Sequence, residues 1–209
     1  MLQAVDELCS RDPDLAFVVT KHGPPPMWAR SPGFATLVRI VLEQQVSLSS
    51  AEAAFNRLRA RVRRVSAVRL SRLSLLQIMR LGITRQKAGF IRGIAHATTT
   101  GQLSLRSLSR ADDVTARDAL LQFSGIGPWT ADIYLIMALR RPDVWPHGDL
   151  VLARSLKHLK RLRSDPGSDA LRRITATWAP WRSVAARIVW HSYLTERRLG
   201  RRARLPGKL

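Results

Sequence analysis

Asp149 and the glycine pair Gly125 and Gly127 are residues whose types and spacing could do chemistry. Asp149 follows Pro146-His147-Gly148 and precedes an apolar-periodic segment, so we expect it at the start of a helix. The dipole of that helix favours the ionised carboxylate. Such an anion can stabilise a developing cation and can orient or deprotonate a water molecule. The same position also suits an ordinary helix-capping aspartate. Taken alone, the position favours this capping role over a catalytic one.

The two glycines belong to a short connection, Phe123 to Asp132, between two expected helices. Glycine tolerates positive φ and removes side-chain bulk, so the backbone can approach another molecule closely. The N–H groups of Gly125, Ile126 and Gly127, and those at the start of the helix at Thr130, can point together at a phosphate. A plain corner between two helices with a glycine cap is the alternative. Ile126 is expected to plug the hairpin into the core.

The charge of the chain favours a polyanionic partner. Its 209 residues include 35 Lys and Arg against 15 Asp and Glu, a formal net charge of +20. An excess of cations this large most often serves nucleic acid. Arginine-rich codon usage would explain part of the excess, but it does not explain why acidic residues are so few. Hydrophobic residues make up 45%, enough for one domain or for two small lobes.

Cysteine and hydropathy exclude several classes of protein. Cys9 is the one cysteine, which rules out a disulfide within the chain and an all-cysteine zinc or iron–sulfur site. Met1 to Arg11 lacks an apolar signal core, and the run from Ile133 to Leu139 is far shorter than the ~20 residues that span a bilayer. We therefore expect a soluble, cytoplasmic protein, with a basic tail that frays from Arg197 to Lys208.

The apolar periodicity is helical almost throughout. Phe34, Leu37, Val38 and Val41 form one apolar face, and Pro32-Gly33 opens that helix. The segment from Thr130 to Leu139 is apolar nearly all round and should be buried. With no alternating strands and no repeat, the expected fold class is all-α. The other expected helices are a short one before Gly23, then 51–62, 73–79, 85–97, 113–123, 150–162, 168–178 and 183–199.

Leu121 to Asp132 resembles the helix-hairpin-helix of the HhH-GPD superfamily of DNA glycosylases, most closely the bacterial 3-methyladenine DNA glycosylase II type. Other segments resemble further motifs of that family in the same order, so the likeness covers residues of about 34 to 190. These segments are Val38 to Ser47, Leu81-Gly82-Ile83 with Lys87-Ala88, Arg141 to Pro146 with Gly148-Asp149-Leu150, and Trp178 to Ala185.

The resemblance implies two helical lobes with a central cleft. Residues 31–139 would form the central lobe, with the helix-hairpin-helix at about 113–139. Residues 1–30 and 140–209 would form the second lobe, with Asp149 at the cleft. The nearby acids Asp132 and Asp143 are read as capping or paired structural groups, and Arg182 and Ser183 as support for the surroundings of Asp149.

The resemblance also implies a reaction, because Asp149 falls on the family's catalytic aspartate. Loss of the base leaves oxocarbenium character at the sugar C1′, which this carboxylate would stabilise while directing water. No general acid is needed if the leaving base is cationic, as 3-methyladenine and 7-methylguanine are. Trp129 stands where bifunctional relatives carry the lysine of a Schiff base. We therefore expect a monofunctional hydrolase of base excision repair that leaves an abasic site.

Further roles follow from aligned positions. Trp129 and Trp190 would line the base pocket, with Ile133 at the position of a tyrosine in some relatives and Tyr134 beside it. Gln44 and Gln45 fall on the segment that carries the wedge filling the gap left by a flipped base. A monovalent cation, Na⁺ or K⁺, would bind the carbonyls of Leu121, Phe123 and Ile126, and no cofactor is required.

Two alternatives remain at this stage. The same fold could act on an etheno, deaminated or oxidised base instead of an alkylated purine. The chain could also be a non-catalytic DNA-binding protein that uses its hairpin merely to grip. In the preferred interpretation, a monomer acts on double-stranded DNA that contains a damaged base.

Overall fold

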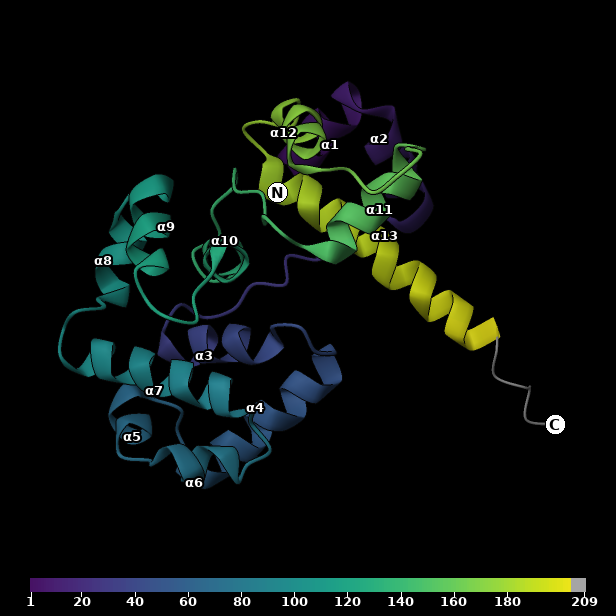
Figure 1. The fold of residues 1–209 in the computed structure, drawn as a ribbon. Coiled ribbons are helices and arrows are strands. Elements are labelled where there is room, and N and C mark those ends of the chain that lie inside the picture. Colours follow the sequence, from purple (N-terminus) through teal and green to yellow (C-terminus); the bar gives the residue numbers. More distant parts are fainter. Residues whose placement is uncertain (204–209) are drawn as a thin grey trace. The chain divides into compact units, whose positions relative to one another are not determined.

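All regular elements in the described part of the chain are α-helices, as expected (Figure 1). The computed structural model describes the backbone of residues 1–203 and the side chains of residues 1–197. The basic tail was expected to fray from Arg197, but α13 continues to Ala203, and the rest of the tail lies outside the described residues. The chain divides into unit 1, Met1–Trp28 with Pro142–Leu209, and unit 2, Ala29–Arg141. The expected central segment, 31–139, begins and ends two residues inside unit 2; the cleft stays a prediction.

Unit 2 is built around α10, which is buried from Thr130 to its last residue. Every residue from Thr130 to Met137 is at most 9% exposed, because α3, with its own apolar face, and α9 pack against it. The long helix α7 packs on α3, α5 and α6. The helices of unit 2 are α3 (Phe34–Glu43), α4 (Leu48–Val62), α5 (Ala67–Ser71), α6 (Leu75–Met79), α7 (Arg85–Thr99), α8 (Leu105–Arg110), α9 (Asp113–Leu121) and α10 (Pro128–Met137).

Unit 1 joins the two ends of the chain around its last helix. The first half of α13 carries an apolar run, Val184 to Trp190, that packs against α1, α2 and α11. Within this run the guanidinium of Arg187 is buried, and desolvation lowers its pKa to about 10. The helices of unit 1 are α1 (Leu2–Arg11), α2 (Pro13–His22), α11 (Leu150–Leu159), α12 (Ser168–Ala176) and α13 (Arg182–Ala203).

The structure differs from the expected elements at three places. The single short N-terminal helix is two helices, because Asp12 caps α2 and Pro13 occupies its first position. The helices α5 and α8 were not expected, since each is too short to show a full apolar period. Ser104 does cap α8 by accepting from the Ser107 N–H, and this polar signal could have revealed it.

Asp12 also connects helices that lie far apart in the sequence. Its carboxylate accepts from the Lys160 ammonium at 2.7 Å and from the Trp178 indole N–H at 2.7 Å. Burial alone would raise the pKa of Asp12, but these hydrogen bonds hold it below its ordinary value. The ionised carboxylate therefore stabilises the fold of unit 1, and this stabilisation depends on pH.

Asp12→Asn is expected to lower the free energy of unfolding at pH 7 by about 1–3 kcal/mol, since asparagine keeps the cap but loses the charge. A lowered pKa in the native state means that this stabilisation is complete above the ordinary aspartate pKa and is lost as pH falls through the lowered value. Urea unfolding at pH 7 and at about pH 3 checks this. A difference of the same size at both pH values would contradict it.

Candidate nucleic-acid interface and active site

The hairpin is a tight reversal between α9 and α10. The helix α9 ends at Leu121, and the Ile126 N–H donates to the Phe123 carbonyl at 3.0 Å. Gly127 is the N-cap of α10, and Pro128 follows at the first helical position. Ile126 is 3% exposed and packs into unit 2, as expected. The first N–H groups of α10 are thus presented at a helix N-terminus, which suits an anion.

Gly125 shows why this position requires glycine. Its φ is +89°, in the left-handed region, and a Cβ placed there would overlap Cγ of Phe90 and lie 2.6 Å from its Cδ2. Gly127 differs, because its φ is −86° and a Cβ added to it would meet no atom within 4 Å. One glycine is needed for the turn, and the other leaves open space beside the backbone.

Gln44 clamps this hairpin from α3. Its Nε2 donates to the Gly125 carbonyl and to Oγ1 of Thr130, both at 2.8 Å. Thr130 itself is only 2% exposed. These contacts engage both side chains inside unit 2, so they argue against the expected wedge role of the Gln44 side chain. A backbone contact from Thr130 stays a prediction.

Gln44→Ala is expected to lower the free energy of unfolding by about 1–3 kcal/mol, because two part-buried acceptors lose their donor. Gln45→Ala is the matched control: the neighbouring glutamine is exposed, so stability should change by less than about 0.5 kcal/mol. Urea unfolding of both variants measures the difference. Equal stability of the two would show that the clamp contributes nothing to the fold.

Lys87 holds the backbone from which Gln45 projects. Its ammonium donates to the carbonyls of Leu42 and Gln44, both at 2.7 Å, at the C-terminal end of α3. Partial burial lowers the pKa of Lys87. Gln45 adopts a left-handed φ of +54° and is exposed. The Lys87 hydrogen bonds therefore hold the turn after α3 in place. Gln45, and not Gln44, has a side chain that is exposed and available to contact a ligand.

Asp149 is the N-cap of α11, as expected. Its Oδ1 accepts from the Leu152 N–H at 2.9 Å, and its own N–H donates to the Pro146 carbonyl. The side chain is half-buried. Gly148 precedes it with a φ of +78°, which turns the chain into the helix. The carboxylate is thus held at the N-terminus of α11.

The segment leading to Asp149 is anchored on α13. The Arg182 guanidinium donates from Nε and Nη2 to the two oxygens of Asp143 at 2.8 and 2.7 Å. Ser183 donates to the Val144 carbonyl and accepts the Val144 N–H, at 2.9 and 3.0 Å. These contacts confirm the expected structural roles of Asp143, Arg182 and Ser183. Asp132 has a comparable structural role in unit 2, where it accepts from Nε of Arg117 at 2.7 Å.

The ring of Trp145 continues this anchoring. It lies 5.6 Å, between ring centroids, from Trp178, whose indole N–H is held by Asp12. Both tryptophans are buried. Because the backbone at 143–145 is tied to α13 and to this pair, the chain reaches Asp149 from a rigid base. Sequence reasoning did not single out Trp145 or Trp178 for this support.

The four residues expected to line the base pocket differ in how deeply they are buried. Trp129 is half-buried at the second position of α10, and Ile133, one turn further, is 4% exposed. Trp190 lies on α13 and is 8% exposed. Tyr134 corrects the expectation: it is 0% exposed, and its hydroxyl accepts the Gly33 N–H at 3.0 Å. It is therefore a core residue of unit 2, and the other three stay predictions.

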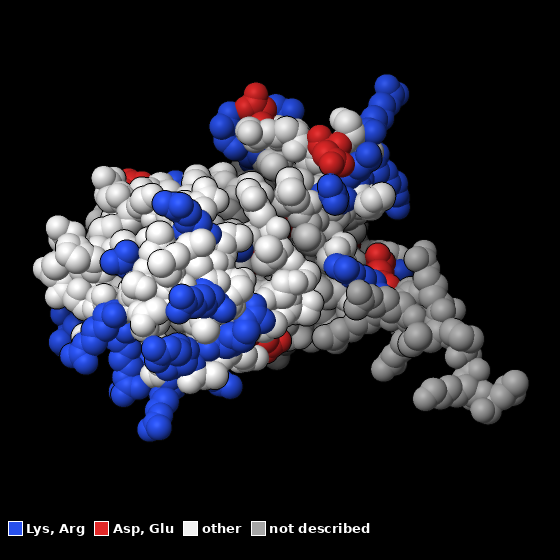
Figure 2. All heavy atoms as spheres, turned by 60° about the horizontal axis from the view of Figure 1, so that its bottom comes forward, with Lys and Arg blue, Asp and Glu red and all other residues white. Residues whose placement is uncertain are grey.

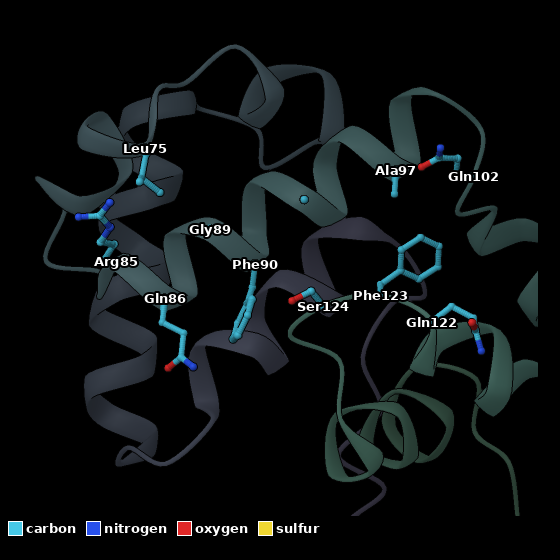
Figure 3. A pocket seen from close by; sticks show the side chains of 11 residues that line it. Leu75, Arg85, Gln86, Gly89, Phe90, Ala97, Gln102, Gln122, Phe123 and Ser124 are labelled. Carbon is cyan, nitrogen blue, oxygen red and sulfur yellow. The ribbon is translucent and has the colours of Figure 1, made fainter.

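A groove of about 470 Å³ lies beside the hairpin, entirely within unit 2 (Figure 3). Exposed small residues of α7, Gly89 and Gly93, form part of its wall and leave the helix backbone open. Sequence reasoning missed this groove, although the four-residue spacing of the two glycines places them on one helix face. Its lining is Leu75, Arg85, Gln86, Gly89, Phe90, Gly93, Ala97, Gln102, Gln122, Phe123 and Ser124.

Among the described residues, no cluster of three or more His, Cys, Asp or Glu side chains could hold a metal ion. The expected monovalent cation would instead use backbone carbonyls of Leu121, Phe123 and Ile126. The Phe123 carbonyl already accepts one hydrogen bond, from Ile126, which leaves a second lone pair.

None of the described helices is long and apolar enough to cross a membrane.

Comparison with known proteins gives one consistent family. Residues 38–180 match the profile of the HhH-GPD superfamily base excision DNA repair proteins. A DNA-3-methyladenine glycosylase of Bacillus subtilis is 33% identical over 58% of this chain, which spans only 40% of that relative's length. DNA-3-methyladenine glycosylase 1 of Schizosaccharomyces pombe is 28% identical over 90% of this chain and 83% of its own.

The fold agrees with this likeness. A solved 3-methyladenine DNA glycosylase of Schizosaccharomyces pombe, in complex with abasic DNA, superposes with a TM-score of 0.82. It is 25% identical, and the match covers 93% of this chain and 97% of that one. A relative of this length and fold is therefore seen bound to DNA.

Proposed function

Because the chain belongs to the HhH-GPD superfamily of base excision DNA repair proteins, we propose that it is a monofunctional DNA glycosylase for alkylated purines. It hydrolyses the N-glycosidic bond of 3-methyladenine or 7-methylguanine and leaves an abasic site. The observation that carries this proposal is the anchored carboxylate of Asp149 at the N-terminus of α11. The names of the similar proteins from Bacillus subtilis and Schizosaccharomyces pombe support the substrate class.

The reaction begins with a damaged nucleotide that leaves the duplex, at a cost of a few kcal/mol. Trp129 and Trp190 receive the base, and stacking on an aromatic ring returns about 1–3 kcal/mol. An indole face also favours a cationic base by roughly 0.5–2 kcal/mol. This preference is small, so the weakened glycosidic bond of an alkylated purine supplies most of the selectivity.

Bond cleavage then depends on charge. As the base departs with the bonding electron pair, C1′ gains oxocarbenium character, and Asp149 stabilises it as an anion. The same carboxylate orients or deprotonates the water that attacks C1′. The base of 3-methyladenine or 7-methylguanine is already cationic and leaves as a neutral molecule, so no proton has to be supplied to it.

The residues beside the hairpin argue against a lyase step. A lyase needs an amine to form a Schiff base with the sugar, and the position after the hairpin is Trp129. Lys87 is the only lysine in the sequence of unit 2, and its ammonium is bound to two main-chain carbonyls. This absence of an available lysine amine within unit 2 supports hydrolysis without strand cleavage.

The partner in this proposal is double-stranded DNA with one damaged base, bound by a monomer. Gly125 and Gly127 hold a phosphate through their N–H groups, because the Ile126 N–H is already donated to the Phe123 carbonyl. A monovalent cation on the carbonyls of Leu121, Phe123 and Ile126 would add positive charge beside that phosphate. No cofactor takes part in the reaction.

A panel of duplexes, each with one defined lesion, tests the proposal. Release of 3-methyladenine and 7-methylguanine, with strand breaks appearing only after alkali, is the expected result. Release of only uracil, 8-oxoguanine or an etheno base would replace the substrate class while keeping the fold. If no base is released and undamaged DNA binds equally well, the chain is a DNA-binding protein without catalysis.

Gln45 is the proposed wedge. Gln45→Ala should slow base release from a duplex about 5–100-fold, because the gap left by the flipped base stays unfilled, at a cost of roughly 1–3 kcal/mol. Release from single-stranded DNA, which has no opposing strand to fill against, should change much less. Single-turnover assays on both substrates make this comparison. An equal loss on both would assign Gln45 a role other than a wedge.

A further inference from the structure

The segment that contains α4, α5 and α6 and the turns after them carries an exposed set of arginines, here called the arginine face. Figure 2 shows Lys and Arg side chains gathered where this end of unit 2 comes forward, with little red among them. All members of the set are exposed, although Arg57 and Arg69 also donate to main-chain carbonyls. The arginine face consists of Arg57, Arg59, Arg61, Arg63, Arg64, Arg69, Arg72 and Arg80.

Acidic residues do not offset this charge. The sequence contains no Asp or Glu between Glu52 and Asp112, a segment that includes the whole arginine face. Among the described residues, no ion pair reaches this face. The ion pairs found in unit 2 join Arg30 and Arg39 to Glu43, Arg39 to Glu52, Arg117 to Asp132, and Arg141 to Asp113.

Unit 1 contains both paired arginines and exposed arginines such as Arg163 and Arg173. The arginine face is therefore distinguished by the absence of acidic residues in its segment of the sequence and not by its arginine content alone. The pairs in unit 1 include Arg11 with Glu7, Lys157 with Asp165, Lys160 with Asp12 and Asp14, and Arg182 with Asp143.

The arginine face adjoins the groove beside the hairpin. Arg57 donates to the Leu81 carbonyl and lies against Gly82, in the loop that leads from α6 into α7. That helix begins with Arg85, which lines the groove together with Ser124 of the hairpin. Positive charge and open backbone therefore continue from the hairpin, along α7, to the arginine face.

We propose that the arginine face binds the sugar–phosphate backbone of undamaged duplex that flanks the lesion. The inference rests on the proposed function, since it extends the strand held by the hairpin through the groove. Exposed arginines on flexible stems suit phosphates, whose spacing is the same in every sequence. Gly89 and Gly93 leave space for a sugar–phosphate chain, because a Cβ added to either would meet no atom within 4 Å. Each phosphate contact releases counterions, so binding must depend on salt.

The test compares two variants that lose the same charge. The variant R59Q/R61Q/R64Q/R72Q removes four members of the face that make no side-chain hydrogen bond among the described contacts. The control R106Q/R110Q/R163Q/R173Q removes four exposed arginines elsewhere. Each is assayed on a lesion duplex of about 12 base pairs and on one of about 40, with the lesion near one end of the longer duplex in either orientation.

Wild type should bind the long duplex more tightly than the short one, with a steeper dependence of affinity on salt. The face variant should lose at least about tenfold in affinity for the long duplex, and its log–log salt slope should become shallower by about 2–4. The control should lose less, and single-turnover base release from the short duplex at saturating protein should stay at the wild-type rate in both. A face variant that keeps the length preference, or a control that loses as much, would overturn the inference.

Failure of the proposed function would be seen separately. If wild type releases no base from either duplex, the glycosylase proposal fails, while the binding measurements still report on the arginine face. If the face variant differs from wild type only in binding anionic lipid vesicles and not in binding DNA, the inference is wrong about the partner.

Discussion

Asp149→Asn is expected to reduce the rate of base release about 10²–10⁴-fold and to leave duplex binding close to that of wild type. Asparagine has the same shape and is as good an N-cap as aspartate, so it can still accept the Leu152 N–H. The variant therefore loses the negative charge without losing the start of α11. Since stabilisation of the sugar cation depends on that charge, the loss should appear in the chemical step.

Single-turnover release of 3-methyladenine, measured beside duplex affinity and urea unfolding, checks this result. Asp112→Asn is the matched control, because Asp112 is also a helix N-cap, accepting from the Thr115 N–H at 2.9 Å, but belongs to α9. It should release base at the wild-type rate. Full activity of Asp149→Asn would remove Asp149 from the mechanism, and equal losses in both variants would assign the effect to helix capping.

Gly125→Ala is expected to have the second-largest effect, on both stability and DNA binding. A methyl group there must adopt a φ of +89° and would overlap the side chain of Phe90. The left-handed conformation costs roughly 1–2 kcal/mol and overpacking roughly 1–3 kcal/mol. The free energy of unfolding should therefore fall by about 2–5 kcal/mol. To relieve the overlap, the hairpin turn at Gly125 must open. The backbone N–H groups of the hairpin then no longer point in one direction, so affinity for the DNA duplex should also fall.

Gly127→Ala separates the two effects. At φ −86°, with no atom within 4 Å of the added methyl group, alanine fits the fold, so stability should change by less than about 1 kcal/mol. If the hairpin backbone approaches a phosphate closely, that methyl group should still weaken duplex binding. Urea unfolding and binding titrations of both variants decide the matter. Normal binding by Gly127→Ala would place the phosphate away from this glycine.

The sequence predicted a residue's structural role correctly where that role depends on residues close to it in the chain. The buried helix α10, the cap formed by Asp149 and the buried plug Ile126 all follow from periodicity or from turn chemistry within a few residues. The superfamily was identified from several motifs that occur in the family's order. Each motif alone is a weak signal, but the ordered set is specific. Local patterns of this kind are fixed by backbone geometry, which the sequence reports directly.

Expectations failed where contacts join distant segments. Gln44 and Gln45 are adjacent and chemically identical, yet Gln44 clamps the hairpin while Gln45 is exposed. Ile133 and the neighbouring Tyr134 were both expected at the base pocket, but the Tyr134 hydroxyl accepts the Gly33 N–H, about a hundred residues earlier. No local pattern distinguishes such neighbours, since the difference comes from what the rest of the fold brings to each side chain.

The sequence by itself determined the helical class, the family, the capping aspartate and the glycine corner, because each rests on spacing along one stretch of chain. Only the tertiary structure decided which side chains are occupied inside the protein: Gln44 with the hairpin, Lys87 with the end of α3, and Arg182 with Asp143. The physical reason is that a polar side chain leaves water only when a partner satisfies it, and here the partners come from elements far away in sequence.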